Sequence, residues 1–498
     1  MAYNAQGRAS IGDEKGAGLT TFLIGLAILA IGGFVYGRVC ERVMAPTDDP
    51  TPATARRDGV DFVPMKKWRN SLIELLNIAG TGPILGPIQG ALFGPVAFIT
   101  IPVGCVIAGA FHDYMVGMMS IRNGGAQTPD LIRLFLGKRF YAAYSVFVCL
   151  LLLLIGVVFV YTPGDIFVTQ ILQQDSSLSN PVLWVVYGAI FAYYVAASLL
   201  PIDKIIGRVY PVFGAILLFS AVGVFVGLFV NGYELPELWN AADAGFPLQE
   251  NFVPIFFVTV TCGILSGFHS TQATLVSRTV VSEREGRTTF YDMMIAEGFI
   301  AMTWAAGAMG AMAQGLAEAD ALWTAPTSVV GVISYDMLGS VGGIIALVGI
   351  IVLPITSGDT ALRGLRLTLG DALHLDMKSK ANVLKLALPI FATVFVLLVW
   401  AKSDAQGFGL LWRYFSWANE TIAVFALTMI AMYMAKTAKP YVMALVPGTF
   451  YLFVVTCYIL SAHIGFNLPW EAAYVVAGAC ACAYVALVVR AARRVRTT

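Results

Sequence analysis

The chain has 498 residues, of which 58% are hydrophobic and only 12% are charged. Soluble proteins carry about 25% charged residues, and the mean hydropathy here is +0.77, so the composition excludes a soluble protein. A net charge of +1 excludes a surface dedicated to nucleic acid as the main feature of the chain.

Thirteen stretches are apolar enough to cross a bilayer core, which takes about 20 residues. The expected fold is therefore all-α and integral to the membrane. In chain order the predicted spans are 19–37, 71–93, 95–120, 141–161, 182–200, 208–231, 252–277, 292–316, 330–357, 384–400, 412–435, 440–461 and 472–490. We interpret the first as a retained transmembrane helix, because no clean basic region leads into a cleavable signal. The polar segment from Met44 to Trp68 is the longest linker.

Basic residues are distributed unevenly between the two sides of the predicted membrane. The connections after odd-numbered spans hold 27 of the 31 lysines and arginines, and Arg8, Lys15, Lys402 and Arg413 are the remaining four. Basic residues concentrate on the cytoplasmic side of membrane proteins. We therefore expect a multi-pass protein of the cell (inner) membrane, with the N-terminus outside and the C-terminus in the cytoplasm.

The second and seventh spans are interrupted by small and polar residues. The second contains NIAGTGPILGPIQG, from Asn77 to Gly90, and the seventh contains VTVTCGILSGFHSTQATLVS. Broken helices are tolerated in a membrane where they line a cavity. Because the two spans lie five apart, spans 2–6 and 7–11 would run in opposite directions, as in an inverted repeat. Both breaks would then face each other near the middle of the membrane, with interruptions near Gly80–Pro87 and Gly263–Gly267.

These two breaks supply the predicted substrate-binding residues. Half-helix ends present partial charges to a bound solute, and the half-helix expected beyond Pro87 would favour a negative one. Ser266 and His269 add side-chain donors from the second break. Close helix packing is the alternative explanation for the glycines. The predicted substrate-binding residues are Gly80, Thr81, Gly82, Pro83, Gly86, Ser266, Gly267 and His269.

Two aspartates inside spans are candidates for proton or cation coupling, because buried ionisable residues are costly and usually functional. Asp113 lies nine residues before Arg122, or about 13 Å from the inner end of its helix. Asp359 is placed at the cytoplasmic end of the ninth span. A structural ion pair is the alternative explanation for each of them.

Further polar residues inside spans are secondary candidates. His112 precedes Asp113 but points about 100° away around a helix, so the two need not share a ligand. Asn419 and Glu420 lie in the eleventh span, and Glu297 in the eighth receives less weight.

The sequence contains no motif of an enzyme or of an ATP-driven pump. G-x-S-x-G, H-E-x-x-H and P-loop patterns are absent, and no reactive nucleophile stands beside a base. The seven cysteines form no C-x-x-C pair and are interpreted as small buried hydrophobic residues. We expect no cofactor and no metal site, and any uphill transport has to use an ion gradient.

Five motifs resemble, in this order, those of the carbon starvation protein A (CstA) family. They are NIAGTGPILGPIQGALFG, GAFHDYMVGMMSIRNGG, TCGILSGFHSTQATLVSRTV, ITSGDTALRGLRLTLGD and FSWANETIAV. The resemblance implies secondary transport of peptides or pyruvate with proton coupling, and kinship with the leucine-transporter fold. In that fold a cation sits between the first core helix and the inner part of the eighth. Thr356 and Ser357 are the matching positions here.

The sequence therefore predicts a secondary active transporter that moves a small carboxylate metabolite, pyruvate or a short peptide, by alternating access. The coupling cation is a proton or, alternatively, sodium, and the remaining partner is membrane lipid. A non-transporting sensor for the same solute stays open as another class. The expected organisation is an extracytoplasmic N-terminus, first span and linker (1–70), an inverted-repeat core (71–435, divided into 71–231 and 252–435) and two further spans with a basic tail (436–498).

Overall fold

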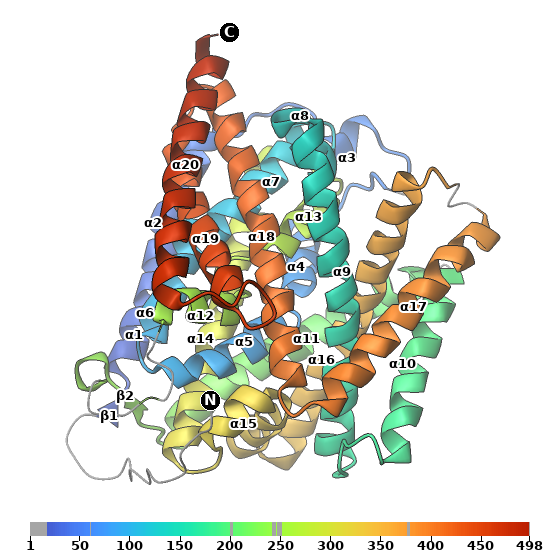
Figure 1. The fold of residues 1–498 in the computed structure, drawn as a ribbon, viewed down its shortest axis with the longest axis vertical. Helices are drawn as coiled ribbons and strands as arrows, with labels where there is room; N and C mark the ends of the chain where they lie inside the picture. The colour runs from blue at the N-terminus through green and yellow to red at the C-terminus, as the bar shows by residue number, and fades with distance from the viewer. Residues whose placement is uncertain are drawn as a thin grey trace.

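The architecture consists almost entirely of helices that run along the long axis of the molecule (Figure 1). The computed structural model describes residues 17–59, 61–199, 203–241, 246, 251–375 and 379–497. In this part of the chain one small sheet pairs β1 (Ala17–Gly18) antiparallel with β2 (Leu235–Pro236). The carboxylate of Glu237 then accepts hydrogen bonds from the N–H groups of Thr20 and Thr21, at 2.7 Å each. These contacts fix the start of the first helix against the loop that follows the sixth predicted span.

Eleven helices in the described residues are long and apolar enough to cross a membrane. Some contain a short π-helical or 3-10 segment, so that several labels belong to one span. Their bounds are α1 (Thr20–Ala27), η1 (Ile28–Gly32) and α2 (Gly33–Met44); α6 (Ala97–Gly104), η3 (Cys105–Gly109) and α7 (Ala110–Arg122); α9 (Lys138–Ile166) and η4 (Phe167–Ile171); α10 (Pro181–Leu199); α11 (Asp203–Val230); η6 (Glu283–Glu285), η7 (Arg287–Tyr291) and α14 (Asp292–Ala313); α16 (Pro326–Ala372); α17 (Lys380–Ser403); α18 (Gly407–Lys436); α19 (Val442–Ser461); and α20 (Trp470–Thr497).

Short helices cap the two ends of the molecule. In Figure 1, α3 (Pro52–Ala55) and α8 (Thr128–Leu136) lie at the upper end, whereas α15 (Ala319–Thr324) lies at the lower end. The remaining short element is η5 (Leu238–Asn240). Helix α1 begins at the lower end and α20 finishes at the upper end. The first and last spans therefore start and finish on opposite faces, as an odd number of crossings requires.

Two spans are broken in the middle. Helix α4 (Lys67–Ile78) is followed by α5 (Gly82–Gly90) and η2 (Ala91–Phe93), and the axis bends by 50° at the break. Helix α12 (Phe252–Thr259) is separated from α13 (Gly267–Val276) by an irregular segment. Discontinuous helices were predicted in both places, and both are present.

The predicted number of thirteen spans stays a prediction, because it counts each of the two broken spans as one membrane crossing. The described residues contain eleven helices that are long and apolar enough to cross, or twelve if the bent pair of α4 and α5 counts as one. All thirteen predicted ranges overlap helices. The range 252–277 contains α12 and α13, which have 8 and 10 residues and are each too short to cross alone.

The first break is also shorter than predicted. The expected interruption near Gly80–Pro87 covers only Ala79 to Thr81, because α5 already begins at Gly82. Pro83 occupies the first turn of α5, where a missing N–H costs little, and Pro87 lies inside the same helix. The half-helix therefore starts before Pro83 rather than beyond Pro87.

Helix α16 differs from its predicted span in length and shape. It runs for 47 residues and is kinked at Gly339, whose φ of 67° favours glycine. The helix continues well beyond the predicted end at 357, to Ala372. As a result Thr356, Ser357 and Asp359 lie within a continuous helix and not at its end.

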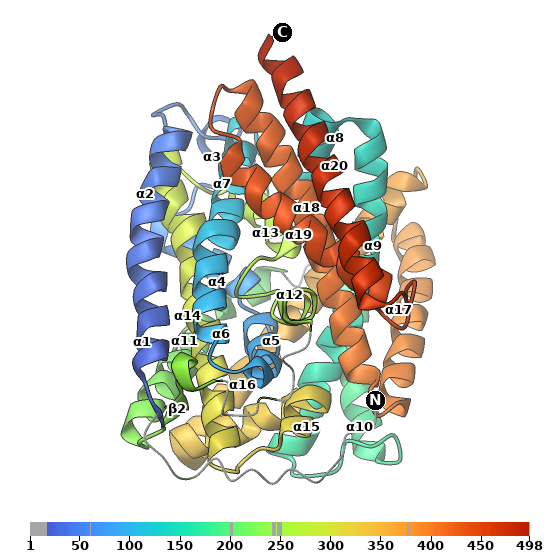
Figure 2. The same cartoon turned by 60° about the vertical axis from the view of Figure 1, so that its left-hand side comes forward.

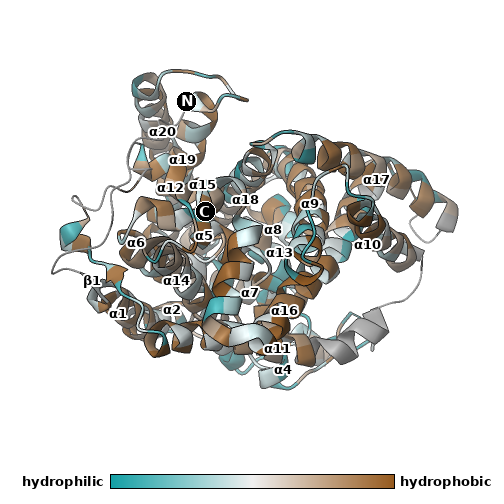
Figure 3. Ribbon diagram, turned by 90° about the horizontal axis from the view of Figure 1, so that it is seen from below, coloured by the Kyte–Doolittle hydropathy of each residue, from teal (hydrophilic) through white to brown (hydrophobic). Residues whose placement is uncertain are grey.

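Polar residues gather where the broken helices meet, whereas the outer helices are apolar. Seen along the long axis, the outward faces of α1, α10 and α17 are largely hydrophobic, and paler or hydrophilic segments lie nearer the centre around α13 (Figure 3). Helix α13 packs against α4, α7 and α18, while α5 packs against α14. Helices α19 and α20 add a layer beside α18 (Figure 2). Helices α7, α14 and α18 therefore pack against the segments that carry the two breaks.

A buried ion pair links three of the long helices. Asp165 of α9 pairs with Lys402 of α17, and each side chain is less than one tenth exposed. The hydroxyl of Thr327 in α16 donates to Asp165 Oδ2 at 2.7 Å. Lys402 Nζ also donates to Ser176 Oγ at 3.1 Å. The pair therefore joins α9, α16 and α17 at one point.

Removing one partner of this pair is expected to destabilise the protein strongly. Asp165→Asn leaves the Lys402 ammonium buried without its carboxylate, which costs about 3–5 kcal/mol. The control is Asp130→Asn, since Asp130 pairs with Arg133 at 3.0 Å on the surface, with both side chains more than half exposed, and exposed pairs contribute about 0.2–1 kcal/mol. The loss of stability in each variant is measured by unfolding the purified proteins in detergent. Equal stability of the two variants would contradict a structural role for Asp165.

Candidate functional site

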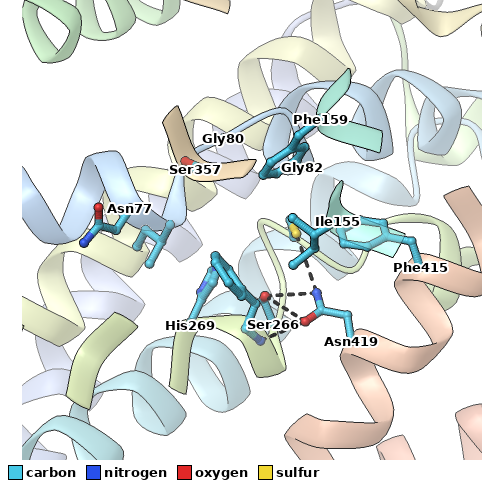
Figure 4. A pocket seen from close by; sticks show the side chains of 13 residues that line it. Asn77, Gly80, Gly82, Ile155, Phe159, Ser266, His269, Ser357, Phe415 and Asn419 are labelled. Carbon is cyan, nitrogen blue, oxygen red and sulfur yellow. Dashed lines mark hydrogen bonds between the residues drawn. The ribbon is translucent and has the colours of Figure 1, made fainter. Parts of the chain in front are cut away.

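A small cavity lies between the two helix breaks (Figure 4). Its volume is about 20 Å³, which is enough space for one or two water molecules. Its lining combines aromatic and aliphatic walls with a few polar groups. The lining residues are Asn77, Ile78, Gly80, Gly82, Ile155, Phe159, Cys262, Ser266, Phe268, His269, Ser357, Phe415 and Asn419.

The two breaks approach each other closely, as the sequence predicted. A Cβ atom on Gly82 would lie 2.4 Å from both Cβ and Sγ of Cys262, so only a glycine fits there without displacing the second break. Gly80 is different, because a Cβ on it would meet only Phe159, at 3.6 Å. Gly82 thus sets the spacing between the breaks, whereas Gly80 borders free space.

The first break leaves polar groups without partners. Thr81 Oγ1 is buried and has no hydrogen-bond partner. The carbonyl of Thr81 accepts from the N–H groups of Ile84 and Leu85 as α5 begins. Since Pro83 has no N–H and those of Ile84 and Leu85 are bonded to Thr81, the N–H groups of Thr81 and Gly82 are the ones without a backbone partner at this break. Such an arrangement suits an anionic group.

Asn419 of α18 holds the second break in place. Its Oδ1 accepts from the N–H of Phe268 at 2.8 Å, and its Nδ2 donates to Ser266 Oγ at 3.0 Å (Figure 4). A longer contact of 3.8 Å joins Nδ2 to Cys262 Sγ. Ser266 is therefore already hydrogen-bonded inside the protein, and Asn419 positions the segment that carries it.

A buried cluster of acidic and histidine side chains lies behind the cavity. His269 Nδ1 is 3.1 Å from Asp113 Oδ2, and His112 Nδ1 is 2.7 Å from Asp113 Oδ1. On its other side, His269 Nε2 lies 3.6 Å from Glu297 Oε2. All four side chains are at most 1% exposed. His269 is the member of this cluster that also lines the cavity.

The cluster corrects the expectation that His112 and Asp113 act separately. Although successive residues point about 100° apart on a helix, the His112 ring bends back onto its neighbour's carboxylate. Among the described residues, no group of three or more His, Cys, Asp or Glu side chains is arranged to hold a metal ion.

The structure places the predicted ion-coupling residues of α16 in different surroundings. Ser357 lines the cavity opposite the first break. The hydroxyl of Thr356 instead donates to the carbonyl of Leu353 at 2.9 Å. Asp359 is turned away and lies 3.5 Å from Arg363, one turn further along the helix. Asp113 and Asp359 therefore belong to different parts of the protein.

Several other predicted site residues lie outside the cavity lining. Close packing accounts for Gly86 and Gly267, since a Cβ on Gly86 would lie 2.9 Å from the carbonyl oxygen of Thr259, and one on Gly267 2.3 Å from that of Asn419. Pro83 is part of α5. Glu420 is 1% exposed and faces away from the cavity, with no hydrogen-bond partner at either carboxylate oxygen.

Sequence reasoning missed Glu74 and gave too little weight to Glu297. Glu74 lies on α4, is completely buried, and has no hydrogen-bond partner at either oxygen. It interacts electrostatically with Asp113 and His269. An acidic residue five positions before the break at Ala79 was a usable signal, but Glu74 was not weighed as a candidate.

Comparison with known proteins identifies the evolutionary relatives of this chain. The family model described as carbon starvation protein CstA matches residues 17–162 and 157–319. An uncharacterized membrane protein of Haemophilus influenzae is 43% identical over 328 residues, which cover 57% of this chain and 88% of that protein.

Relatives with named functions are more distant and longer. The peptide transporter CstA of Bacillus subtilis is 27% identical over 306 residues, covering 51% of each chain. The pyruvate/proton symporter BtsT of Escherichia coli is 24% identical over 314 residues, covering 51% of this chain and 43% of that protein. The match thus spans about half the length of these two relatives.

Solved structures show the fold. A manganese transporter of Eremococcus coleocola, solved with an aromatic bis-isothiourea substituted compound, superposes with a TM-score of 0.53 at 11% identity. The superposition covers 88% of this chain and 98% of that one. The architecture is accordingly that of leucine-transporter-like proteins. The relatives and this neighbour are transporters and not enzymes.

Proposed function

Because this chain belongs to the carbon starvation protein CstA family, we propose that it is a proton-coupled symporter of a small carboxylate metabolite. Membership in a transporter family of multi-pass membrane proteins is established by the comparisons. The substrate class, the coupling ion and the direction of transport are the proposal. The relatives point to pyruvate or a short peptide as the first solutes to test.

The observation that carries the proposal is a cavity enclosed by two opposed helix breaks. Transporters place substrate sites near the middle of the membrane, where half-helix ends point at the solute. Here the N–H groups of Thr81 and Gly82 at the start of α5 are available to a carboxylate, and Phe159, Phe268 and Phe415 provide apolar walls. A small molecule with one carboxylate and a short apolar body matches this lining.

Coupling is proposed to run through His269, because it is the residue shared by the cavity and the buried cluster. Its ring contacts Asp113 on one side and Glu297 on the other. A carboxylate solute that entered the cavity would alter the electrostatic field at His269, and a proton held in the cluster would favour an anionic solute in return. This reciprocity is the thermodynamic requirement of symport. Ser357 remains a candidate for a second cation at the first break.

The orientation proposed from the basic residues places the start of α1 outside and the end of α20 in the cytoplasm. The upper end of the molecule in Figure 1 is then cytoplasmic. In the same scheme residues 71–231 and 252–435 form two inverted halves, with 1–70 and 436–498 as additions. The two broken helices open these two halves, which is the relation that an inverted repeat predicts.

Uptake into proteoliposomes tests the proposed function. Purified protein is expected to accumulate labelled pyruvate or a labelled dipeptide when the outside is made acidic. For one proton per substrate at zero membrane potential, a pH difference of one unit supports about tenfold accumulation. Empty liposomes and a dissipated gradient are the controls. Accumulation driven by a sodium gradient alone would show that sodium, and not the proton, is the coupling ion. Binding without any transport would instead favour the sensor class.

A further inference from the structure

Two buried acids beside the His269–Asp113 pair have no assigned role. Glu74 on α4 and Glu297 on α14 are both fully buried. None of their four carboxylate oxygens has a hydrogen-bond partner. Asp113 is different, because each of its oxygens contacts a histidine. The cluster therefore contains one acid with partners and two without hydrogen bonds.

The neighbours of these two acids are too few to balance three negative charges. Asp113 of α7 contacts His112 and His269, and His269 of α13 lies 3.6 Å from Glu297. The thiols of Cys105 and Cys262 are the other titratable neighbours among the described residues, and neither is cationic. The cluster thus contains three carboxyl groups and two imidazoles. One of these imidazoles, that of His112, already contacts Asp113 on the same helix.

An ionised carboxylate without hydrogen bonds is very unfavourable in a space without water. The neutral acid avoids most of this cost, since it carries no net charge. We therefore expect Glu74 and Glu297 to be protonated in this structure. His269 and Asp113 can remain a charge pair between them.

An open groove lies on the side of the molecule where α4 begins, and its lining includes the residue next in sequence to each acid. The groove is lined by residues of α4, α11, α14 and η7, which are Lys67, Trp68, Ser71, Leu72, Leu75, Leu218, Thr288, Met293 and Ala296. Leu75 follows Glu74 directly, and Ala296 directly precedes Glu297. A movement of α4 relative to α5 about the break between them would open a path from the groove to both acids. Each acid would then ionise by passing its proton to water in that path.

We propose that Glu74 and Glu297 are two proton-binding sites that flank the His269–Asp113 pair and release their protons on the groove side during transport. This inference rests on the proposed symport function. It predicts that more than one proton accompanies each substrate.

Two measurements test the proposal, one of which needs no substrate. Infrared spectra of the purified protein at neutral pH report protonated carboxyl groups, and Glu74→Gln and Glu297→Gln are each expected to remove part of that absorption. The proton-to-substrate ratio, measured from the reversal of transport at set gradients, is expected to fall by about one in each variant. The matched control is Glu420→Gln, because Glu420 is equally buried and unpaired but lies outside the cluster. It should lose its own infrared absorption and keep the wild-type ratio.

The possible results separate this inference from the proposed function. Unchanged infrared absorption in both cluster variants would mean that the acids are ionised, and it would overturn the proposal even in a working transporter. Lost absorption with an unchanged ratio would overturn the transport role of the two protons. A wild-type protein that moves neither substrate would refute the proposed symport, while the infrared result would still decide whether the acids are protonated.

Discussion

Asp113→Asn is expected to abolish uphill transport. In the wild-type protein Asp113 is the acid that both His112 and His269 contact, at 2.7 and 3.1 Å. Asparagine keeps the size and some hydrogen bonding of the side chain but cannot carry the charge that stabilises a protonated His269. Accumulation under a pH difference of one unit, which is at least about tenfold when one or more protons accompany each substrate, should fall to none. Exchange of labelled for unlabelled substrate, which needs no net proton movement, should remain measurable.

Asp359→Asn is the matched control for this experiment. Asp359 also lies in a membrane helix and is 3% exposed, but it pairs with Arg363 and not with the histidine cluster. We expect Asp359→Asn to retain gradient-driven accumulation. Loss of accumulation in Asp359→Asn with retention in Asp113→Asn would assign coupling to α16. Retention in both variants would exclude proton coupling through either aspartate.

Gly82→Val is expected to disrupt the substrate site while the protein still inserts into the membrane. Even a single Cβ at this position would lie 2.4 Å from the Cys262 side chain, so valine forces the two breaks apart. Overpacking of this kind costs about 1–3 kcal/mol, which corresponds to about a 5- to 150-fold loss of affinity if the cost falls on the bound state. Substrate binding to the purified protein measures the effect directly.

Gly80→Ala serves as the control, since it changes a glycine two residues away in the same break. Its Cβ would meet only Phe159, at the ordinary contact distance of 3.6 Å. Binding and transport should remain close to the wild type. If both glycine variants lost binding equally, the loss would come from backbone freedom in the break and not from the contact with Cys262.

The breaks could be predicted from the sequence because their cause is local. Glycine lowers helix stability by about 1 kcal/mol relative to alanine. Unpaired backbone groups are also energetically costly inside a membrane. A cluster of small and polar residues in a span therefore indicates a break with a specific role. The exact limits of the first break were wrong. Pro83 and Pro87 were interpreted as part of it, yet both lie in α5, where a first-turn proline is well tolerated.

The buried cluster could be predicted only in part, because its contacts join helices that are distant in the sequence. Asp113 and His269 are 156 positions apart, and their individual burial in spans was predicted but their pairing was not. Glu74 escaped notice because its depth depends on where α4 begins. Lys67, and not residue 71, is the first helical residue, which moves Glu74 further into the protein.

The small size of the cavity has a thermodynamic consequence for substrate affinity. Space for one or two waters cannot hold a three-carbon acid, so the substrate binds to a more open member of the conformational ensemble. Apparent affinity is then the intrinsic affinity reduced by the fraction of molecules in that open form. Every 1.4 kcal/mol by which tight packing favours the closed form weakens the apparent affinity about tenfold. Residues that never touch the solute, such as Gly267, which packs α13 against α18, therefore set part of its dissociation constant.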